Sequence, residues 1–145
     1  MLSVESLSKS FGETQVLKNI SLDIPDGETT VILGPSGSGK STLLRCLNLL
    51  ETPQSGTLTI DGAQVDYSQK LTDVQVRDIR SRSAMVFQQF NLFPNYTALK
   101  NVALAPTLNG TLSAQEAQER ARELLAKVGL ADKVDSYPDA LSGGR

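Results

Sequence analysis

Hydrophobic and polar residues alternate over residues 2–9 and again over residues 16–24. Such alternation is typical of β-strands that are buried on one face only. Gly12 and Glu13, between the two stretches, are suited to a turn. The pattern therefore predicts two antiparallel strands joined by a short turn.

Shorter hydrophobic runs predict three further strands. Residues 57–60 form one run and end at Asp61 and Gly62, a dipeptide typical of β-hairpins. Residues 28–33 and 84–87 form two more runs with few polar interruptions, which predicts buried strands.

Hydrophobic residues at helical spacing predict helices over residues 41–50, 71–82 and 97–105, and a fourth that begins at Ser113. Pro106 is expected to end the third helix, because proline cannot donate a backbone hydrogen bond. The Ser113 hydroxyl and Glu116 form a capping box, and Gly129 is a favoured residue after a helix end. One face of this fourth helix carries Ala117, Ala121, Leu124, Leu125 and Val128.

The predicted strand at residues 28–33 leads into the spacing Gly-x-x-x-x-Gly-Lys-Ser of a phosphate-binding loop. The residues of the candidate loop are Gly34, Pro35, Ser36, Gly37, Ser38, Gly39, Lys40, Ser41 and Thr42. Its glycines allow unusual backbone dihedral angles and let bare N–H groups approach an anion. Lys40 would reach the β- and γ-phosphates, and the Ser41 hydroxyl would bind Mg²⁺. The alternative is a Gly/Ser-rich surface loop, but the strand before it and the helix after it favour nucleotide binding.

Composition limits the possible functions. The chain has 145 residues, of which 39% are hydrophobic, enough for a globular core. A formal net charge of -2 without a long basic run gives no indication of nucleic-acid binding. Cys46 is the single cysteine, so an intrachain disulfide is excluded and a reducing compartment is expected. The absence of histidine excludes an imidazole base from this chain. No hydrophobic run approaches the roughly 18 to 20 residues that cross a bilayer, so a membrane role would come through a partner.

Four segments, in order along the chain, resemble the ATP-binding subunits of ABC transporters. The phosphate-binding loop is the first. The second is Ser10-Phe11-Gly12 followed by Val16-Leu17, which resembles the aromatic loop of that family. The resemblance implies that Phe11 stacks on adenine and that Val16 touches the nucleotide. Without this resemblance, a single phenylalanine such as Phe11 is more often a core residue.

The third segment resembles the family's Q-loop and reads Met85-Val86-Phe87-Gln88-Gln89-Phe90-Asn91-Leu92-Phe93-Pro94. The resemblance implies that Gln88 is catalytic and reaches Mg²⁺ or the attacking water, whereas a solvated loop glutamine is the alternative. So many hydrophobic residues in a loop indicate a docking site for another protein. In the family, the transmembrane permease is that partner, so residues 88–94 are expected to contact it.

The fourth segment, Leu141-Ser142-Gly143-Gly144, resembles the signature motif of the family. Ser142 can cap a helix, and Gly143 and Gly144 expose N–H groups to an anion, which predicts a second phosphate site. Read alone, Ser-Gly-Gly is only a flexible turn. In the family this motif faces the phosphate-binding loop of a second subunit with ATP between them, which implies a homodimer.

The resemblance implies an α/β fold: a P-loop NTPase core with an N-terminal antiparallel β-subdomain over residues 1–88, and a helical subdomain over residues 89–145. The helical subdomain ends in the signature motif, so the fold is expected to be incomplete at the C-terminus. Arg145 stands where the family usually has glutamine. The acidic strand, the glutamate and the switch histidine that serve hydrolysis come later in family members. The chain alone is therefore expected to bind ATP and to hydrolyse it poorly.

The sequence of residues 87–94 and 100–106 is similar to the corresponding sequences of importers of polar amino acids. This likeness implies an ATPase subunit on the cytoplasmic face of the membrane, with ATP and Mg²⁺ as cofactors. Its partners would be a second ATP-binding subunit, the permease and, indirectly, a substrate-binding protein. Two alternatives stay open: a soluble ABC ATPase outside transport, and a nucleotide-binding fragment without catalysis.

Overall fold

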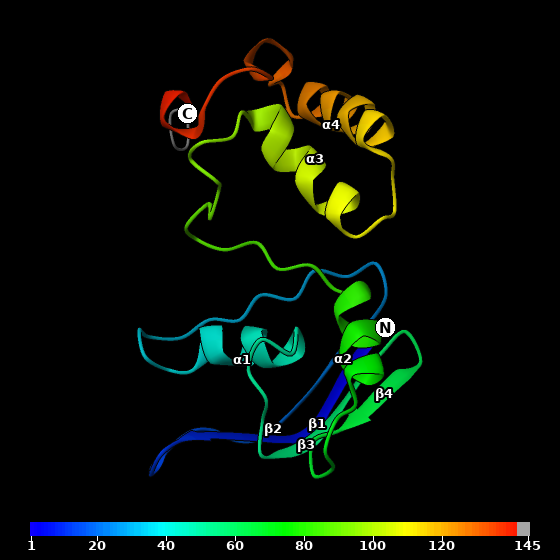
Figure 1. The fold of residues 1–145 in the computed structure, drawn as a ribbon. Coiled ribbons are helices and arrows are strands. Elements are labelled where there is room, and N and C mark those ends of the chain that lie inside the picture. The colour runs from blue at the N-terminus through cyan, green and yellow to red at the C-terminus, as the bar shows by residue number, and fades with distance from the viewer. Residues whose placement is uncertain (142–145) are drawn as a thin grey trace. The chain divides into compact units, whose positions relative to one another are not determined.

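The structure is a computed structural model that describes residues 1–141, and it divides into two compact units, Met1–Val86 and Phe87–Arg145 (Figure 1). Each unit has a hydrophobic core of its own. The phosphate-binding loop belongs to the first unit, and the stretch around Gln88 belongs to the second.

The first unit is built on an antiparallel sheet with the strand order β2-β1-β3-β4. The strands are β1 (Leu2–Phe11), β2 (Thr14–Ile24), β3 (Ser55–Ile60) and β4 (Ala63–Asp66). β1 and β2 pair from Leu2 opposite Ile24 to Phe11 opposite Thr14, which confirms the predicted strand pair. Strands β3 and β4 pair on either side of the Asp61-Gly62 turn, which confirms the hairpin.

Helices α1 (Lys40–Leu47) and α2 (Asp73–Ser81) lie over one face of this sheet (Figure 1). Their buried side chains meet the inward-facing residues of the strands in one cluster. The cluster comprises Val4, Leu7, Leu17, Leu43, Cys46, Leu47, Leu49, Leu58, Ile60, Val65, Tyr67 and Ile79. Burial of this surface is the main term that holds the phosphate-loop helix on the sheet.

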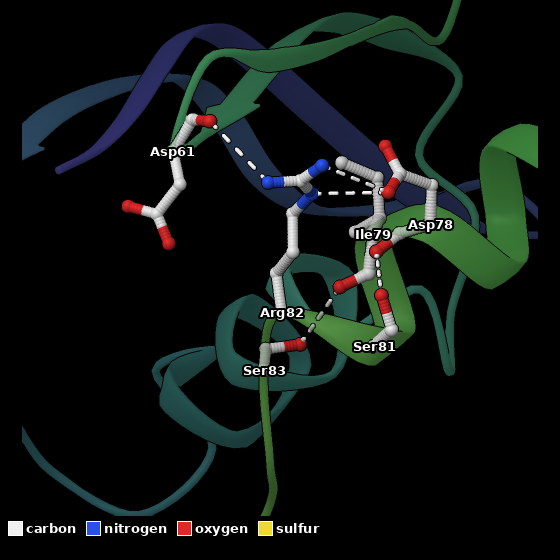
Figure 2. A network of polar contacts seen from close by, with 6 residues as sticks. All are labelled: Asp61, Asp78, Ile79, Ser81, Arg82 and Ser83. Carbon is white, nitrogen blue, oxygen red and sulfur yellow. Dashed lines mark hydrogen bonds and ion pairs between the residues drawn. The ribbon is translucent and has the colours of Figure 1, made fainter.

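A polar network fixes the C-terminal end of α2 (Figure 2). The Arg82 guanidinium donates to the Asp78 carboxylate at 2.9 and 3.1 Å and to the Asp61 carbonyl at 3.4 Å. The side-chain amide of Asn48, just after α1, donates to the Ser83 hydroxyl at 2.7 Å. These contacts tie the β3–β4 turn, α2 and the end of α1 together.

Two predicted strands, over residues 28–33 and 84–87, are wrong for this structure, because no described strand pairs with either stretch. Val31 is 70% exposed and Leu33 is 86% exposed, while Ile32 packs against the core. A strand forms only when a neighbour completes its backbone hydrogen bonds. Hydrophobic sequence predicted strands here, but none of the strands described in residues 1–141 supplies that neighbour.

The second unit packs α3 (Ala98–Leu108) against α4 (Ala114–Lys127). Two short 3₁₀ turns follow, Ala131–Lys133 and Pro138–Ala140. The core between the helices is made mainly of small residues: Ala98, Leu99, Ala103, Ala117, Ala121 and Leu125. Small side chains let two helices approach closely.

Both ends of α4 have the predicted capping. The Ser113 hydroxyl accepts from the Glu116 backbone N–H at 3.3 Å, and the Glu116 carboxylate accepts from the Ser113 N–H at 2.9 Å. After the helix, the Gly129 N–H donates to the Ala126 carbonyl at 3.0 Å, and the Leu130 N–H donates to the Leu125 carbonyl at 2.8 Å. This pair of bonds is the Schellman arrangement, in which a glycine closes a helix.

Two predicted helix ends are wrong. α1 ends at Leu47, three residues early, and α3 continues through Pro106 to Leu108. The Thr107 hydroxyl donates to the Ala103 carbonyl at 2.8 Å, an added bond in the turn that contains the proline. On α4, Leu124 and Val128 are exposed, because α3 covers only the narrow stripe of Ala117, Ala121 and Leu125.

Candidate functional site

The candidate phosphate-binding loop runs directly into α1, which begins at Lys40, within one residue of the predicted start. Gly39 caps the helix with a φ of 90°, a left-handed conformation that favours glycine. A Cβ at this position would lie 3.1 Å from side-chain carbons of both Val16 and Leu17. Gly39 is therefore required both by its backbone conformation and by the close approach of the loop to β2.

One cavity of about 390 Å³ joins the loop to the end of the first strand pair. It is lined by Phe11, Val16, Ser36, Gly37, Ser38, Gly39, Lys40, Ser41 and Thr42. Phe11 ends β1 and Val16 lies near the start of β2, so the hairpin brings both side chains to the loop. The structure thus places the candidate aromatic-loop residues and most of the candidate phosphate-loop residues around one pocket, of a size typical of small-molecule sites.

Gly34 and Pro35 have a different position in the loop. Their carbonyl oxygens accept hydrogen bonds from the Lys40 ammonium at 2.8 and 2.7 Å, and the Ser38 hydroxyl lies 3.3 Å from the same nitrogen. Both residues line a neighbouring cavity of about 300 Å³ rather than the pocket itself. The loop therefore holds the Lys40 ammonium, a cation with three donors, at the pocket wall.

The N-terminus of α1 adds an electrostatic component. No side chain caps the first turn at Gly39, so the first backbone N–H groups of the helix have no side-chain acceptor. These groups and the helix dipole favour an anion at this end. The pocket therefore combines an aromatic ring with a cation and backbone N–H donors, which suits a planar base that carries phosphates.

Ser41 is the candidate Mg²⁺ ligand at this site. Among residues 1–141, no group of three or more His, Cys, Asp or Glu side chains is placed to hold a metal. Mg²⁺ keeps several waters and commonly takes only one or two protein ligands together with phosphate oxygens. The Ser41 hydroxyl therefore fits a site that the phosphates of a nucleotide would complete.

The other candidate residues lie elsewhere. Gln88 is exposed in the stretch without regular structure between α2 and α3, and it belongs to the second unit. Its catalytic and metal-binding roles stay predictions. Ser142, Gly143 and Gly144 lie outside the described residues, so the second phosphate site also stays a prediction.

Lys9 lies beside the pocket, next to Phe11, and motif reasoning does not single it out. The residue is only 8% exposed, and its ammonium lies 4.7 Å from the centre of the Phe11 ring. The sequence does carry a signal, because Leu7, Lys9 and Phe11 alternate along β1 and lysine is unusual at an inward-facing position.

Comparison with known proteins identifies the family. The family model described as ABC transporter matches residues 17–145. The chain is 49% identical to the L-cystine import ATP-binding protein TcyC of Bacillus subtilis and 53% identical to the glutamine transport ATP-binding protein GlnQ of Escherichia coli. Each match covers 100% of this chain and 59% of the relative, so the chain spans about three fifths of the length of these relatives.

Solved structures agree with this match. The ATP-binding cassette MJ0796, in a dimeric post-hydrolysis state bound to ADP and Pi, matches with a TM-score of 0.80 and 38% identity over 99% of this chain and 64% of that chain. No helix within residues 1–141 is long and hydrophobic enough to cross a membrane. The comparisons confirm the α/β cassette fold and the resemblance drawn from the motifs, and the chain belongs to the ABC transporter family of ATP-binding cassettes.

Proposed function

We propose that this chain is the nucleotide-binding part of an ATPase subunit that energises the import of a polar amino acid. The observation that carries the proposal is the pocket in which Phe11 and Val16 meet the loop from Ser36 to Thr42. The names of relatives support the transport role, since these proteins are described as ATP-binding proteins for cystine and glutamine transport.

In the proposed complex, adenine stacks on Phe11, and the triphosphate lies against the loop amides and the N-terminus of α1. Lys40 has each of its donors aimed at Gly34, Pro35 or Ser38. Contact with phosphate therefore requires the ammonium to exchange one of these bonds. Ser41 would hold Mg²⁺, which when bound neutralises charge on the phosphate oxygens.

Hydrolysis requires more than this pocket contains. None of the described residues that line it is a carboxylate, so the pocket offers no carboxylate base to activate water. We therefore propose that residues 1–145 bind Mg-ATP and turn it over slowly, and that Gln88 orients the attacking water. The lack of a carboxylate among the described pocket residues also supports the alternative of a nucleotide-binding fragment without catalysis.

The proposed partners are a second ATP-binding subunit and a transmembrane permease, which would keep the protein at the cytoplasmic face of the membrane. The dimeric state named for the cassette MJ0796 supports the first partner. Exposed Phe90, Leu92 and Phe93 support the second, because they give the stretch after Gln88 a hydrophobic surface.

Titration with Mg-ATP tests the proposal. We expect Lys40→Ala to weaken binding by about tenfold or more, because it removes charged hydrogen bonds to phosphate. Lys70→Ala is the matched control, since Lys70 is exposed and does not line the pocket. In spectra of the wild-type chain, Mg-ATP should shift the amide signals of residues 34–42. Unmoved signals, or equal affinities of the two variants, would contradict nucleotide binding at this loop.

Copurification with a permease tests the transport role separately. Replacing Phe90 and Phe93 with serine should abolish copurification and leave Mg-ATP affinity unchanged. Binding of Mg-ATP without any permease contact would favour a soluble ABC ATPase outside transport.

A further inference from the structure

Residues 51–54, the segment that follows α1, bind the end of β1 through hydrogen bonds and an ion pair. Within it, the Thr52 carbonyl accepts from the Lys9 ammonium at 2.8 Å, and the Glu51 carboxylate lies 3.3 Å from the same nitrogen. Gln54 accepts from the Ser10 backbone N–H at 2.8 Å and donates to the Ser10 carbonyl at 3.1 Å. The residue before Phe11 and the cation beside it are therefore held by the same segment.

Phe11 itself has few restraints. It is the last residue of β1, it is 47% exposed, and it lines the proposed nucleotide pocket. A ring at the exposed end of a strand can move between rotamers. The Lys9 ammonium, 4.7 Å from the ring centre, is attracted by the negative face of the ring. Because Lys9 is itself fixed, this attraction favours one ring position.

We propose that Lys9 is a positioning residue for Phe11 and that it thereby contributes to recognition of the nucleotide base. The inference rests on the proposed function, since it concerns the same pocket. Lys9 does not line that pocket, so its effect would pass through the ring.

A purely structural role for Lys9 predicts something different. A buried ion pair can stabilise a fold, and breaking it can loosen the whole pocket. Such loosening would weaken the binding of every ligand of the loop to the same extent. A positioning role weakens only ligands that carry a base, so inorganic tripolyphosphate is the probe that separates the two.

The experiment measures the dissociation constants of Mg-ATP and of Mg-tripolyphosphate for the full chain and its variants. We expect Lys9→Met to raise the dissociation constant of Mg-ATP by about fivefold, the scale of a partly desolvated cation–π contact. The dissociation constant of Mg-tripolyphosphate should stay unchanged. Lys9→Arg keeps a cation and should restore Mg-ATP binding. Lys9→Gln keeps a hydrogen-bond donor without the charge. If Lys9→Met does not fold, Lys9→Gln should likewise weaken Mg-ATP binding and leave tripolyphosphate binding unchanged.

Two controls complete the design. Glu51→Gln removes the ion pair but keeps the ammonium beside the ring, so the ratio of the two dissociation constants should stay at the wild-type value. In a Phe11→Leu background, Lys9→Met should no longer change that ratio. Equal weakening of both ligands, or no weakening of either, would overturn the inference while the proposed function stands. A wild-type chain that binds neither ligand would instead overturn the proposed function, and this inference with it.

Discussion

The Tyr67 hydroxyl donates a hydrogen bond of 3.1 Å to the carbonyl of Cys46. Tyr67 directly follows β4, and Cys46 lies in α1, so the bond joins the β3–β4 hairpin to the helix that follows the phosphate-binding loop. Both residues are buried in the core of the first unit. The position of α1, and with it that of the loop, therefore depends on packing and on polar contacts from distant parts of the chain.

Tyr67→Phe should lower the free energy of unfolding by about 1 kcal/mol, the usual net value of one hydrogen bond. The loss stays modest because the Leu49 N–H also donates to the Cys46 carbonyl, at 3.1 Å. Tyr67→Ala should cost about 3 to 5 kcal/mol, since it also leaves a cavity. Urea denaturation measures both values, and equal losses would contradict a separate contribution from the hydroxyl.

Cys46 should be unreactive in the folded protein. Burial raises the pKa of its thiol to about 11, an effect that Glu51 reinforces and Lys9 opposes. Because the thiolate is the reactive form, we expect iodoacetamide to modify Cys46 slowly at pH 8 and rapidly after addition of denaturant. Rapid modification under native conditions would contradict the burial of this side chain.

The same thiol should make stability depend on alkaline pH. A raised pKa in the folded state means that Cys46 contributes stability below its ordinary pKa of 9.0 and that this contribution is lost as the pH rises toward about 11. The loss is on the order of 2 to 3 kcal/mol. Burial raises the pKa of Tyr67 too, so its contribution to stability is also lost as the pH rises. Unfolding measured between pH 8 and pH 11 should show a smaller decline for Cys46→Ala.

Gly56→Ala should be among the most damaging glycine substitutions in the sheet. A Cβ there would lie 2.7 Å from the Glu5 carbonyl oxygen and 2.7 Å from the Leu7 Cα, and φ is +107°. We expect a loss of about 3 kcal/mol from overpacking and backbone strain together. Gly62→Ala is the matched control, because its φ of +81° is also positive but its Cβ would meet nothing within 4 Å. Its loss should be nearer about 1 kcal/mol, and equal losses would contradict the role of close packing.

Ser113→Ala should destabilise the second unit by about 1 kcal/mol through loss of the helix cap. The Ser113 contacts hold the pKa of Glu116 below its ordinary value of 4.5, so the contribution is full above that pH and is lost as the pH falls. The difference between wild type and variant should therefore shrink in acid. Arg122→Ala, an exposed change within α4, is the control and should have little effect on thermal unfolding.

Local features of the fold could be predicted from the sequence. The first strand pair, the Asp61-Gly62 hairpin and the Ser113–Glu116 capping box each depend on residues close together along the chain. Their hydrogen bonds and turns are therefore specified within a short segment. The loop from Gly34 to Thr42 was also predicted from a local signal, its spacing of glycines, Lys40 and Ser41, and phosphate binding by this loop stays a prediction.

Burial and pairing were decided only by the tertiary structure. Val31 and Leu33 are hydrophobic yet exposed, and Leu124 and Val128 lie outside the stripe that α3 covers. The sequence alone determined which segments are hydrophobic, and it placed the helix starts to within two residues of those in the structure. Whether a hydrophobic side chain is buried depends on which distant segment packs against it, and that neighbour cannot be read from local periodicity. The contact of Lys9 with Phe11 has the same origin, because segments far apart along the chain must meet before the cation is held against the ring.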